Sequence, residues 1–232
     1  MTDSPPRLVL LRHAQAMLGS EEYDRLSDRG HIQARHLGQR IADTLSGEWP
    51  VWSGALKRQR TTLAALKAPA LAVVDPCLNE YRVDRMVAHA IEQAEVLGIS
   101  QPPEQALADP VSFLHLFLTW FPEVIECWQS GRLNDPCNGR WEDFSRRVMQ
   151  PLPLWQTYLE QGRTVVVVTS AGVISTLVAA LTGKDLAWQR RLNVSLYNAS
   201  VTELRSDARG GWALERLNCV AHLPEDELRT LA

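Results

Sequence analysis

Short apolar runs alternate along the chain with segments in which apolar residues recur every three or four positions. The runs predict strands at residues 7–11, 51–52, 71–74 and 164–169, and the first, which is short, apolar and bounded by polar residues, is expected to be fully buried. The periodic segments predict helices over residues 28–46, 56–66 and about 172–181. Strands that alternate with helices form a parallel sheet covered on both faces. The pattern therefore predicts an α/β fold, a three-layer sandwich with a mostly parallel central sheet flanked by helices.

The helix predicted over residues 28–46 has an apolar face. The residues of that face are Ala34, Leu37, Ile41 and Leu45, at spacings of three and four. Ser27 stands just before the helix, where its hydroxyl can accept a hydrogen bond from a first-turn amide. We therefore expect Ser27 to be the N-cap of this helix.

Residues 81–150 interrupt the alternation, because they contain no clear strand and many Trp and Phe residues. Apolar residues at helical spacing include Leu114, Phe117, Leu118 and Phe121. We expect a helical cap inserted at about 81–150 into a single domain that spans residues 1–232. Helices at about 141–148 and up to Tyr158 lead back to the sheet, and residues 200–217 alternate around a Gly-rich turn as a closing hairpin.

Composition narrows the class of protein. The 232 residues carry a net charge of −3, which gives no general attraction to nucleic acid or to anionic membranes. The N-terminus has no apolar signal core and no stretch reaches transmembrane length, so we expect a cytoplasmic protein without membrane contact. The four cysteines form no C-x-x-C pair, which favours free thiols over a metal or redox site.

The candidate chemistry begins where the first apolar run ends, at Arg12 and His13. The carboxyl ends of parallel strands are where ligands bind in α/β sheets. A neutral histidine there can act as a nucleophile or base through one ring nitrogen while the other is held by a hydrogen bond. The guanidinium of Arg12 matches two phosphoryl oxygens.

Two further strand ends carry suitable groups. Residues 53–62 contain small residues followed by Arg58 at the start of a helix, and helix N-termini favour anions. A cation at the start of a helix interacts unfavourably with the helix dipole, so the position of Arg58 is consistent with an anion bound beside it. Glu80 follows the third apolar run, and a carboxylic acid whose pKa is raised by burial can protonate a leaving oxygen.

These segments, in this order, resemble those of the histidine phosphatase superfamily, which includes the cofactor-dependent phosphoglycerate mutases and many small phosphatases. The R-H-G motif is matched by Arg12-His13-Ala14, the S-x-L-x-R-x-x-x-T segment by residues 54–62, and the L-N-E segment by residues 78–80. Weaker similarities lie at residues 26–30 and 198–201. The resemblance covers about residues 1–84 and 141–220.

The resemblance implies a phosphomonoester hydrolase of the histidine acid phosphatase type. In that mechanism His13 attacks phosphorus and becomes phosphohistidine, while Arg12 and Arg58 clamp the phosphoryl oxygens. Glu80 protonates the leaving alcohol and then activates water. Neither a metal ion nor an organic cofactor takes part, because the arginines supply the positive charge.

Two positions depart from the family pattern. Ala14 replaces the glycine of R-H-G, which is tolerable where the backbone φ is negative. Ser170 replaces the second histidine of the family, which donates to a phosphoryl oxygen and adds positive charge. Losing one such donor costs ~10²–10³ in rate. We expect Ser170 and the backbone amide of Ala171 to bind phosphate instead, with a lower activity.

The partner implied is a small-molecule phosphate ester or a phosphoprotein, and the cap would select it. Gln15, next to the R-H motif, and Arg82, close to Glu80, are candidate contacts to the rest of that substrate. Phosphoglycerate mutase activity is disfavoured, because the segment after Glu80 lacks the His-Tyr-Gly continuation of the glycolytic enzymes.

Two alternatives remain open. The chain could be a non-catalytic phosphoryl-binding or regulatory relative, in view of Ser170. It could also be a serine hydrolase in which Ser170 is the nucleophile, with Asp207 and His222 later in the chain. The second alternative is weaker, because Val168 stands where the first glycine of G-x-S-x-G should be.

Overall fold

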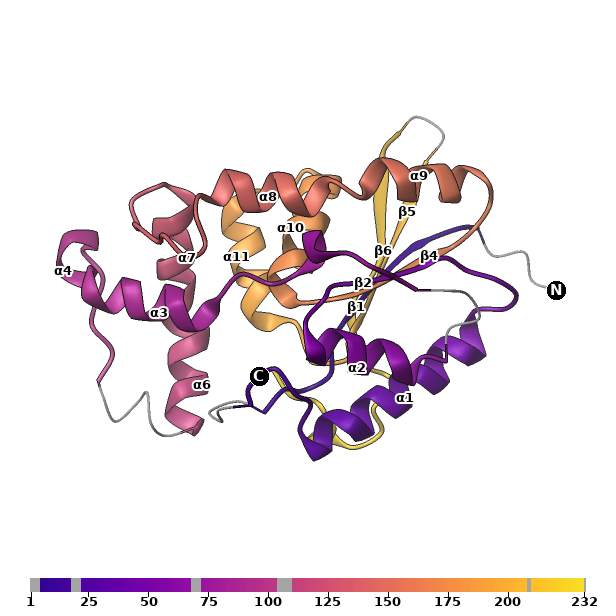
Figure 1. Ribbon diagram of the computed structural model, residues 1–232, viewed down its shortest axis with the longest axis horizontal. Helices are drawn as coiled ribbons and strands as arrows, with labels where there is room; N and C mark the ends of the chain where they lie inside the picture. Colours follow the sequence, from indigo (N-terminus) through magenta and orange to yellow (C-terminus); the bar gives the residue numbers. More distant parts are fainter. Residues whose placement is uncertain (1–4, 18–21, 68–71, 104–109, 208–209, 232) are drawn as a thin grey trace.

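A six-stranded sheet forms the centre of the computed structural model (Figure 1), which describes all residues except 1–4, 18–21, 68–71, 104–109, 208–209 and 232. Its strand order is β3-β2-β4-β1-β5-β6. The strands are β1 (Leu8–Arg12), β2 (Val51–Ser53), β3 (Val73–Val74), β4 (Val165–Thr169), β5 (Val201–Ser206) and β6 (Trp212–Cys219). All four predicted strands and the hairpin are present, although Leu71, in the third predicted strand, lies outside the described residues.

The sheet is mixed. β1, β2, β3 and β4 are parallel to one another, whereas β5 is antiparallel to both β1 and β6. β1 lies at the centre, and its pairing with β4 is in register from Leu8 opposite Val165 to Arg12 opposite Thr169. The carboxyl ends of β1 and β4, at Arg12 and Thr169, therefore lie side by side, although they are far apart in the sequence.

Helices cover both faces of this sheet (Figure 1), and the predicted three-layer α/β fold is confirmed. On one face lies α1 (Asp28–Thr44), with α2 (Lys57–Ala65) beside it; on the other lie α8 (Trp141–Met149), α9 (Leu152–Glu160) and α10 (Ala171–Thr182). The alternation of side chains along β1 accounts for this arrangement. Leu8 and Leu10 belong to the core under α8 and α10, while Val9 and Leu11 belong to the core under α1.

Ser27 caps α1 as predicted, because its hydroxyl accepts a hydrogen bond from the amide of Gly30 at 3.0 Å. A helix that the sequence pattern did not indicate, α11 (Leu186–Ser195), packs beside α10. Short 3₁₀ turns cover Pro76–Leu78 and Asp226–Leu228. None of the described helices has the length and apolar composition required to cross a membrane.

Helices also occupy the region of the predicted insertion. They are α3 (Val83–Glu92), α4 (Ala94–Leu97), α6 (Pro110–Thr119) and α7 (Phe121–Gln129), followed by α8. Figure 1 shows α3, α4, α6 and α7 gathered at one end of the molecule, beyond the carboxyl ends of the parallel strands. Aromatic rings join this group to the main body, because Tyr81 stacks on Phe121 and contacts Phe144 of α8 edge to face. That the chain is one domain with a cap insertion stays a prediction.

The contact between α1 and α2 is close enough to test by substitution. A Cβ atom added at Gly38 of α1 would lie 2.1 Å from the carbonyl oxygen of Ala65 in α2. Alanine is favoured over glycine within a helix by about 1 kcal/mol, but the backbone oxygen cannot swing away. We therefore expect Gly38→Ala to lower the free energy of unfolding by ~1–3 kcal/mol, measured by urea or thermal unfolding.

Arg35→Ala is the control for this measurement, because Arg35 is exposed on the same helix. It should change the free energy of unfolding by no more than ~0.5 kcal/mol. A Gly38→Ala protein as stable as the wild type would contradict the close approach of the two helices.

Candidate active site

The pairing of β1 brings His13 to the centre of the sheet edge. The amide of His13 donates to the carbonyl of Thr169 at the end of β4, at 2.8 Å. On the other side, the amide of Ala199 donates to the carbonyl of His13 at 3.2 Å. Because both neighbouring segments hold its backbone, the imidazole is fixed, and only 5% of the residue is exposed.

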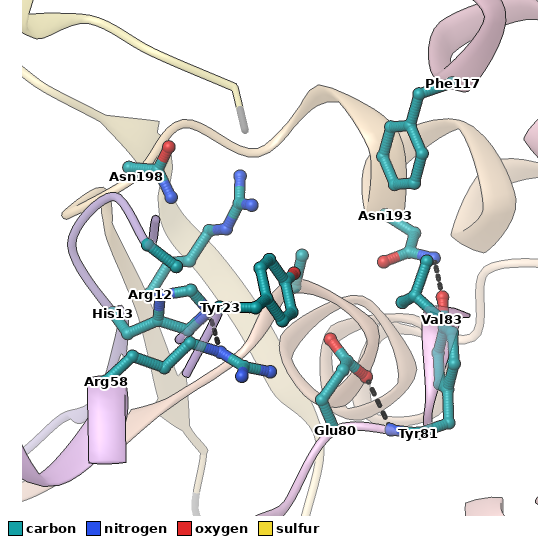
Figure 2. A pocket seen from close by; sticks show the side chains of 12 residues that line it. Arg12, His13, Tyr23, Arg58, Glu80, Tyr81, Val83, Phe117, Asn193 and Asn198 are labelled. Carbon is teal, nitrogen blue, oxygen red and sulfur yellow. Dashed lines mark hydrogen bonds between the residues drawn. The ribbon is translucent and has the colours of Figure 1, made fainter. Parts of the chain in front are cut away.

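A cavity of about 70 Å³ opens beside this histidine (Figure 2). It is lined by Arg12, His13, Ala16, Tyr23, Arg58, Glu80, Tyr81, Val83, Phe117, Ala171, Asn193 and Asn198. Of the residues that the sequence indicated, the structure thus brings Arg12, His13, Arg58, Glu80 and Ala171 together. Gln15, Arg82 and Ser170 are not lining residues.

The two ring nitrogens of His13 have different partners. Nδ1 lies 2.8 Å from the carbonyl oxygen of Ala14, so it carries the proton and donates it. Nε2 lies 3.1 Å from Nε of Arg58, which donates to it (Figure 2). Burial, and then the charges of Arg58 and Arg12, hold the pKa of His13 well below its ordinary value. His13 is therefore a neutral imidazole with a lone pair on Nε2 at neutral pH.

Arg58 lies in the first turn of α2 and is held by residues that the sequence did not single out. Its guanidinium donates to Oδ1 of Asp24 at 2.8 Å, and the other carboxylate oxygen of Asp24 accepts from the amide of Lys57 at 2.9 Å. The ring of Tyr23 lies 5.2 Å from the Arg58 guanidinium carbon. Neither Tyr23 nor Asp24 belongs to a periodic segment, so no pattern indicated them.

Arg12 is buried and anchored by backbone carbonyls. One terminal nitrogen donates to the carbonyl oxygens of Leu196 and of Leu231, the second at 2.7 Å. Nε of Arg12 is buried without a hydrogen-bond partner among the described residues. Burial lowers the pKa of Arg12 to about 10, so it remains positively charged at neutral pH. The unpaired Nε leaves this guanidinium able to bind a further acceptor.

Glu80 lies on the opposite wall, where the N-terminus of α10 holds it. One carboxylate oxygen accepts from the amide of Gly172 at 2.8 Å, and the other from its neighbour Tyr81 at 3.3 Å. A Cβ at position 172 would lie 2.3 Å from Glu80 Oε1, so only glycine leaves room for this contact. Burial raises the pKa of Glu80, although the Gly172 hydrogen bond and Arg58 act in the opposite direction.

Ser170 lies under the cavity wall and is 1% exposed. Its hydroxyl oxygen accepts from Nε2 of Gln59 at 2.8 Å, and the same nitrogen donates to the carbonyl of Leu78 at 3.1 Å. Gln59 belongs to α2, so this hydrogen bond ties the starts of α2 and α10 together. Ala171, one residue further, does line the cavity.

The structure does not bring Gln15 and Arg82 into the cavity. The side-chain oxygen of Gln15 accepts from the Ser27 hydroxyl at 2.9 Å, which turns it toward the start of α1. Arg82 pairs with Asp84 at 3.0 Å, and 59% of its side chain is exposed. Both lie within two residues of a cavity residue, but hydrogen bonds to other groups direct them elsewhere.

The groups of the serine hydrolase alternative are not assembled. Asp207 directly follows β5. Because β5 runs antiparallel to β1 and its last residues lie beside Leu8, Asp207 is at the end of the sheet opposite to the end that carries Ser170. His222 lies near α1, because the charges that act on it are those of Arg40 and His36. No described histidine or carboxylate forms a hydrogen bond with the Ser170 hydroxyl.

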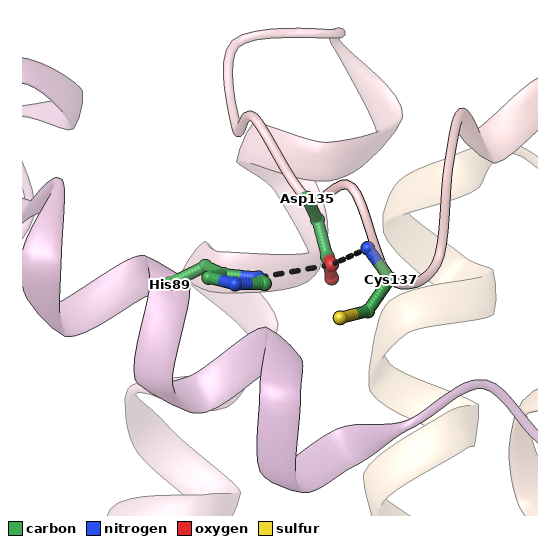
Figure 3. Close-up of side chains that lie close together, drawn as sticks. All are labelled: His89, Asp135 and Cys137. Carbon is green, nitrogen blue, oxygen red and sulfur yellow. Dashed lines mark hydrogen bonds and ion pairs between the residues drawn. The ribbon is translucent and has the colours of Figure 1, made fainter.

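A separate group of three side chains has atoms suited to metal ions (Figure 3). The ligand atoms of His89, Asp135 and Cys137 lie within 4.8 Å of one another. They are already joined by hydrogen bonds, since Oδ1 of Asp135 is 3.0 Å from Nδ1 of His89 and accepts from the amide of Cys137 at 3.1 Å. Asn138 binds the second oxygen. These bonds hold the loop after α7 against α3, which gives the group a structural role.

The raised pKa of Glu80 has a consequence for stability. A carboxyl whose pKa is higher in the folded than in the unfolded protein stabilises the fold fully below the unfolded pKa, and this stabilisation is lost as the pH rises through the folded pKa. We therefore expect Glu80→Gln, which cannot ionise, to have a higher Tm than the wild type at pH 7–8. The difference should shrink toward pH 4, where both proteins are uncharged at position 80.

Calorimetry of the two proteins across this pH range measures the effect. Glu123→Gln is the matched control, because Glu123 is an acidic residue on α7 outside the cavity, and its variant should show no such trend. A Glu80→Gln protein that is less stable than the wild type at pH 8 would contradict the raised pKa.

Comparison with known proteins identifies the family. The family model described as "Histidine phosphatase superfamily (branch 1)" matches residues 8–100 and 119–220. No curated protein sequence shows significant similarity. Many solved structures share the fold, and the relatives below are 16–23% identical to this chain, so the likeness extends to the fold alone.

One of them is a mycobacterial glucosyl-3-phosphoglycerate phosphatase in complex with inorganic phosphate. It is 23% identical, with a TM-score of 0.63, over 94% of this chain and 99% of that chain. YhfR of Bacillus stearothermophilus is 20% identical, with a TM-score of 0.63, over 94% and 98% of the chains. The alpha-ribazole phosphatase of Shigella flexneri is 16% identical, with a TM-score of 0.62, over 92% and 96%. Because the family model matches most of its length, this chain belongs to the histidine phosphatase superfamily, branch 1.

Proposed function

We propose that the protein is a phosphomonoester hydrolase that acts through a phosphohistidine intermediate on His13. The observation that carries the proposal is one cavity that joins a neutral imidazole, two guanidinium groups and a carboxyl with a raised pKa. Two of the solved relatives are named as phosphatases, which supports the same reaction class. The substrate would be a small-molecule phosphate ester or a phosphoprotein.

Binding of the phosphoryl group would rest on Arg12 and Arg58. Both are buried, so their charge-assisted hydrogen bonds to phosphoryl oxygens act in a poorly solvated site, where they are strongest. The backbone at Ala171, at the start of α10, adds the favourable end of a helix dipole. Attack requires the Nε2 lone pair of His13, to which Arg58 Nε donates. When the substrate is bound, Arg58 Nε must therefore donate to a phosphoryl oxygen instead.

The chemical steps would then involve His13 and Glu80. Nε2 forms a bond to phosphorus as the bond from phosphorus to the ester oxygen breaks, and protonated Glu80 gives its proton to that oxygen. The resulting carboxylate takes a proton from water, whose oxygen attacks phosphorus while the P–N bond breaks. Inorganic phosphate leaves, and both His13 and Glu80 return to their starting forms. The hydrogen bond between His13 Nδ1 and Ala14 keeps the ring oriented throughout.

The position of the Glu80 carboxyl in the cavity argues against the alternative of a phosphoryl-binding protein without turnover. A carboxylate next to a phosphate dianion weakens binding, and only its protonated form is compatible with tight binding. The amide of Gly172 nevertheless holds Glu80 in the cavity wall, and this contact leaves no room for a side chain at position 172. An acid that moves a proton during turnover accounts for this arrangement. Ser170 supplies no charge in place of a second histidine, so we propose a rate below that of relatives that have one.

The intermediate is the direct test of the proposal. His13→Asn removes the nucleophile while its amide keeps polar contacts, so the hydrolysis of p-nitrophenyl phosphate should fall by more than ~10³-fold. Rapid acid quenching is unsuitable, because phosphohistidine is acid-labile; quenching in base followed by mass spectrometry should find phosphate on His13 of the wild type alone. Unchanged hydrolysis by a folded His13→Asn protein would overturn the proposal.

Ser170 has a different expected effect. Its hydroxyl accepts from Gln59 under the cavity wall, so Ser170→Ala should lower kcat by less than ~10-fold, the effect of one neutral hydrogen bond rather than of a nucleophile. The measurement is kcat with p-nitrophenyl phosphate at saturating substrate, compared with His13→Asn. A loss as large as that of His13→Asn would instead favour Ser170 as the nucleophile.

A further inference from the structure

We infer that the alcohol part of the substrate is small and uncharged and presents an apolar, preferably aromatic, face, so that esters with a second anionic group are excluded. This inference rests on the proposed phosphatase activity. It follows from the wall that faces the phosphoryl-binding groups, from the charges available in the cavity and from its small volume.

The cavity has two unlike sides (Figure 2). Arg12, His13 and Arg58 lie together on one side, and Val83 and Phe117 lie on the other. A phosphoryl group held by the arginines would therefore direct its alcohol toward Val83 at the start of α3 and Phe117 of α6. The alcohol would meet an apolar surface there, and the volume of about 70 Å³ is well below the roughly 300–1,000 Å³ of common small-molecule sites.

This apolar wall is held firmly. The ring of Phe117 stacks on that of Phe121, with centroids 4.6 Å apart and planes 17° from parallel. Tyr81 is fixed by the side-chain nitrogen of Asn193, which donates to its hydroxyl at 2.7 Å. A preformed apolar wall favours a flat ring, because contact with it removes apolar surface from water with little loss of side-chain freedom.

The phosphoryl group would occupy both cationic side chains of the cavity, which leaves none to bind a second anion. Among the described residues that line the cavity, Arg12 and Arg58 are the only lysines or arginines, and Arg58 is already paired with Asp24. Two guanidinium groups match one phosphate dianion. The arginines that follow Glu80 do not help, because Arg82 and Arg85 are exposed and both lie against Asp84.

The segments outside the described residues bring no lysine or arginine close in sequence to the cavity either. Residues 18–21 read Leu-Gly-Ser-Glu and residues 104–109 read Glu-Gln-Ala-Leu-Ala-Asp. The ionisable residues of these two segments are acidic.

A second anion would therefore meet groups that disfavour it. A carboxylate placed against Phe117 and Val83 would lose its hydration without gaining a cation, which is costly. The amide oxygen of Asn193 also lies on this side of the cavity, because its nitrogen donates to Tyr81 and Figure 2 shows the oxygen turned away from that bond. An oxygen there accepts a hydrogen bond from a neutral donor but repels a carboxylate.

Two matched pairs of esters test the inference with the wild-type protein. Benzyl phosphate and ethyl phosphate differ in a ring, and glycerol 3-phosphate and 3-phosphoglycerate differ in a carboxylate. We expect kcat/KM to be at least ~10-fold higher for benzyl than for ethyl phosphate, and at least ~10-fold lower for 3-phosphoglycerate than for glycerol 3-phosphate. A preference for 3-phosphoglycerate, or no gain from the ring, would overturn the inference.

Charge reversal at the wall makes the test specific. Phe117→Lys should raise the ratio of kcat/KM for 3-phosphoglycerate over glycerol 3-phosphate by at least ~10-fold, since a cation would then face the carboxylate. Val83→Lys is a second variant for the same measurement if the first does not fold. The control is Val96→Lys on α4, where 89% of the residue is exposed, and it should leave the ratio unchanged.

Failure of the inference and failure of the proposed function can be told apart. If none of the four esters is hydrolysed in a manner that His13→Asn abolishes, the proposed function falls and the inference with it. If hydrolysis depends on His13 but 3-phosphoglycerate is the better substrate, or if Val96→Lys shifts the ratio as much as Phe117→Lys, only the inference is overturned.

Discussion

The parallel pairing of β1 with β4 is the constraint on which the site depends. The backbone hydrogen bonds of the ladder place Arg12 opposite Thr169, and His13 continues the pairing by donating to the Thr169 carbonyl. The residues that follow each strand therefore share one edge of the sheet. A shift of the register by one residue would turn His13 to the other face and would bury polar groups in the apolar layers. Because Val165 to Val168 are apolar on both faces of β4, the polar residues at the strand ends, and not the valines, oppose that shift.

Buried charge is the second feature that organises the site. Arg12 and Arg58 repel each other, and both lower the pKa of His13. Burying such groups is costly unless hydrogen bonds compensate. Backbone carbonyls compensate at Arg12 and Asp24 compensates at Arg58, whereas Glu80 keeps a raised pKa. The neutral imidazole and the protonatable carboxyl thus follow from one cause, which is the exclusion of water from a cavity with two cations.

The helices beyond the sheet edge give the cavity its second wall. Val83 begins α3 and Phe117 lies in α6, and both lie outside the three motifs at residues 12–14, 54–62 and 78–80. The side with Arg12, His13 and Arg58 is built on strand ends and helix starts of the main body, where the backbone fixes each group. The opposite side is built from helices that pack through aromatic rings such as Tyr81 and Phe121. The two sides of the cavity are therefore held by different kinds of contact.

The sequence by itself determined the α/β class and the strands of the sheet, and its resemblance to the family indicated His13, Arg12, Arg58 and Glu80 as residues of the candidate site. These depend on local patterns, since a short apolar run and the polar group that ends it are neighbours in the chain. The helix α11 was missed because its apolar residues are irregularly spaced, although Gly183 in the left-handed conformation and the Asp185 N-cap mark its start. Only the tertiary structure decided that Asp24 holds Arg58, that Ser170 faces Gln59 and that Arg82 turns to Asp84. Each of those contacts is the outcome of a competition among several partners, and most of the partners are brought together only when distant segments pack.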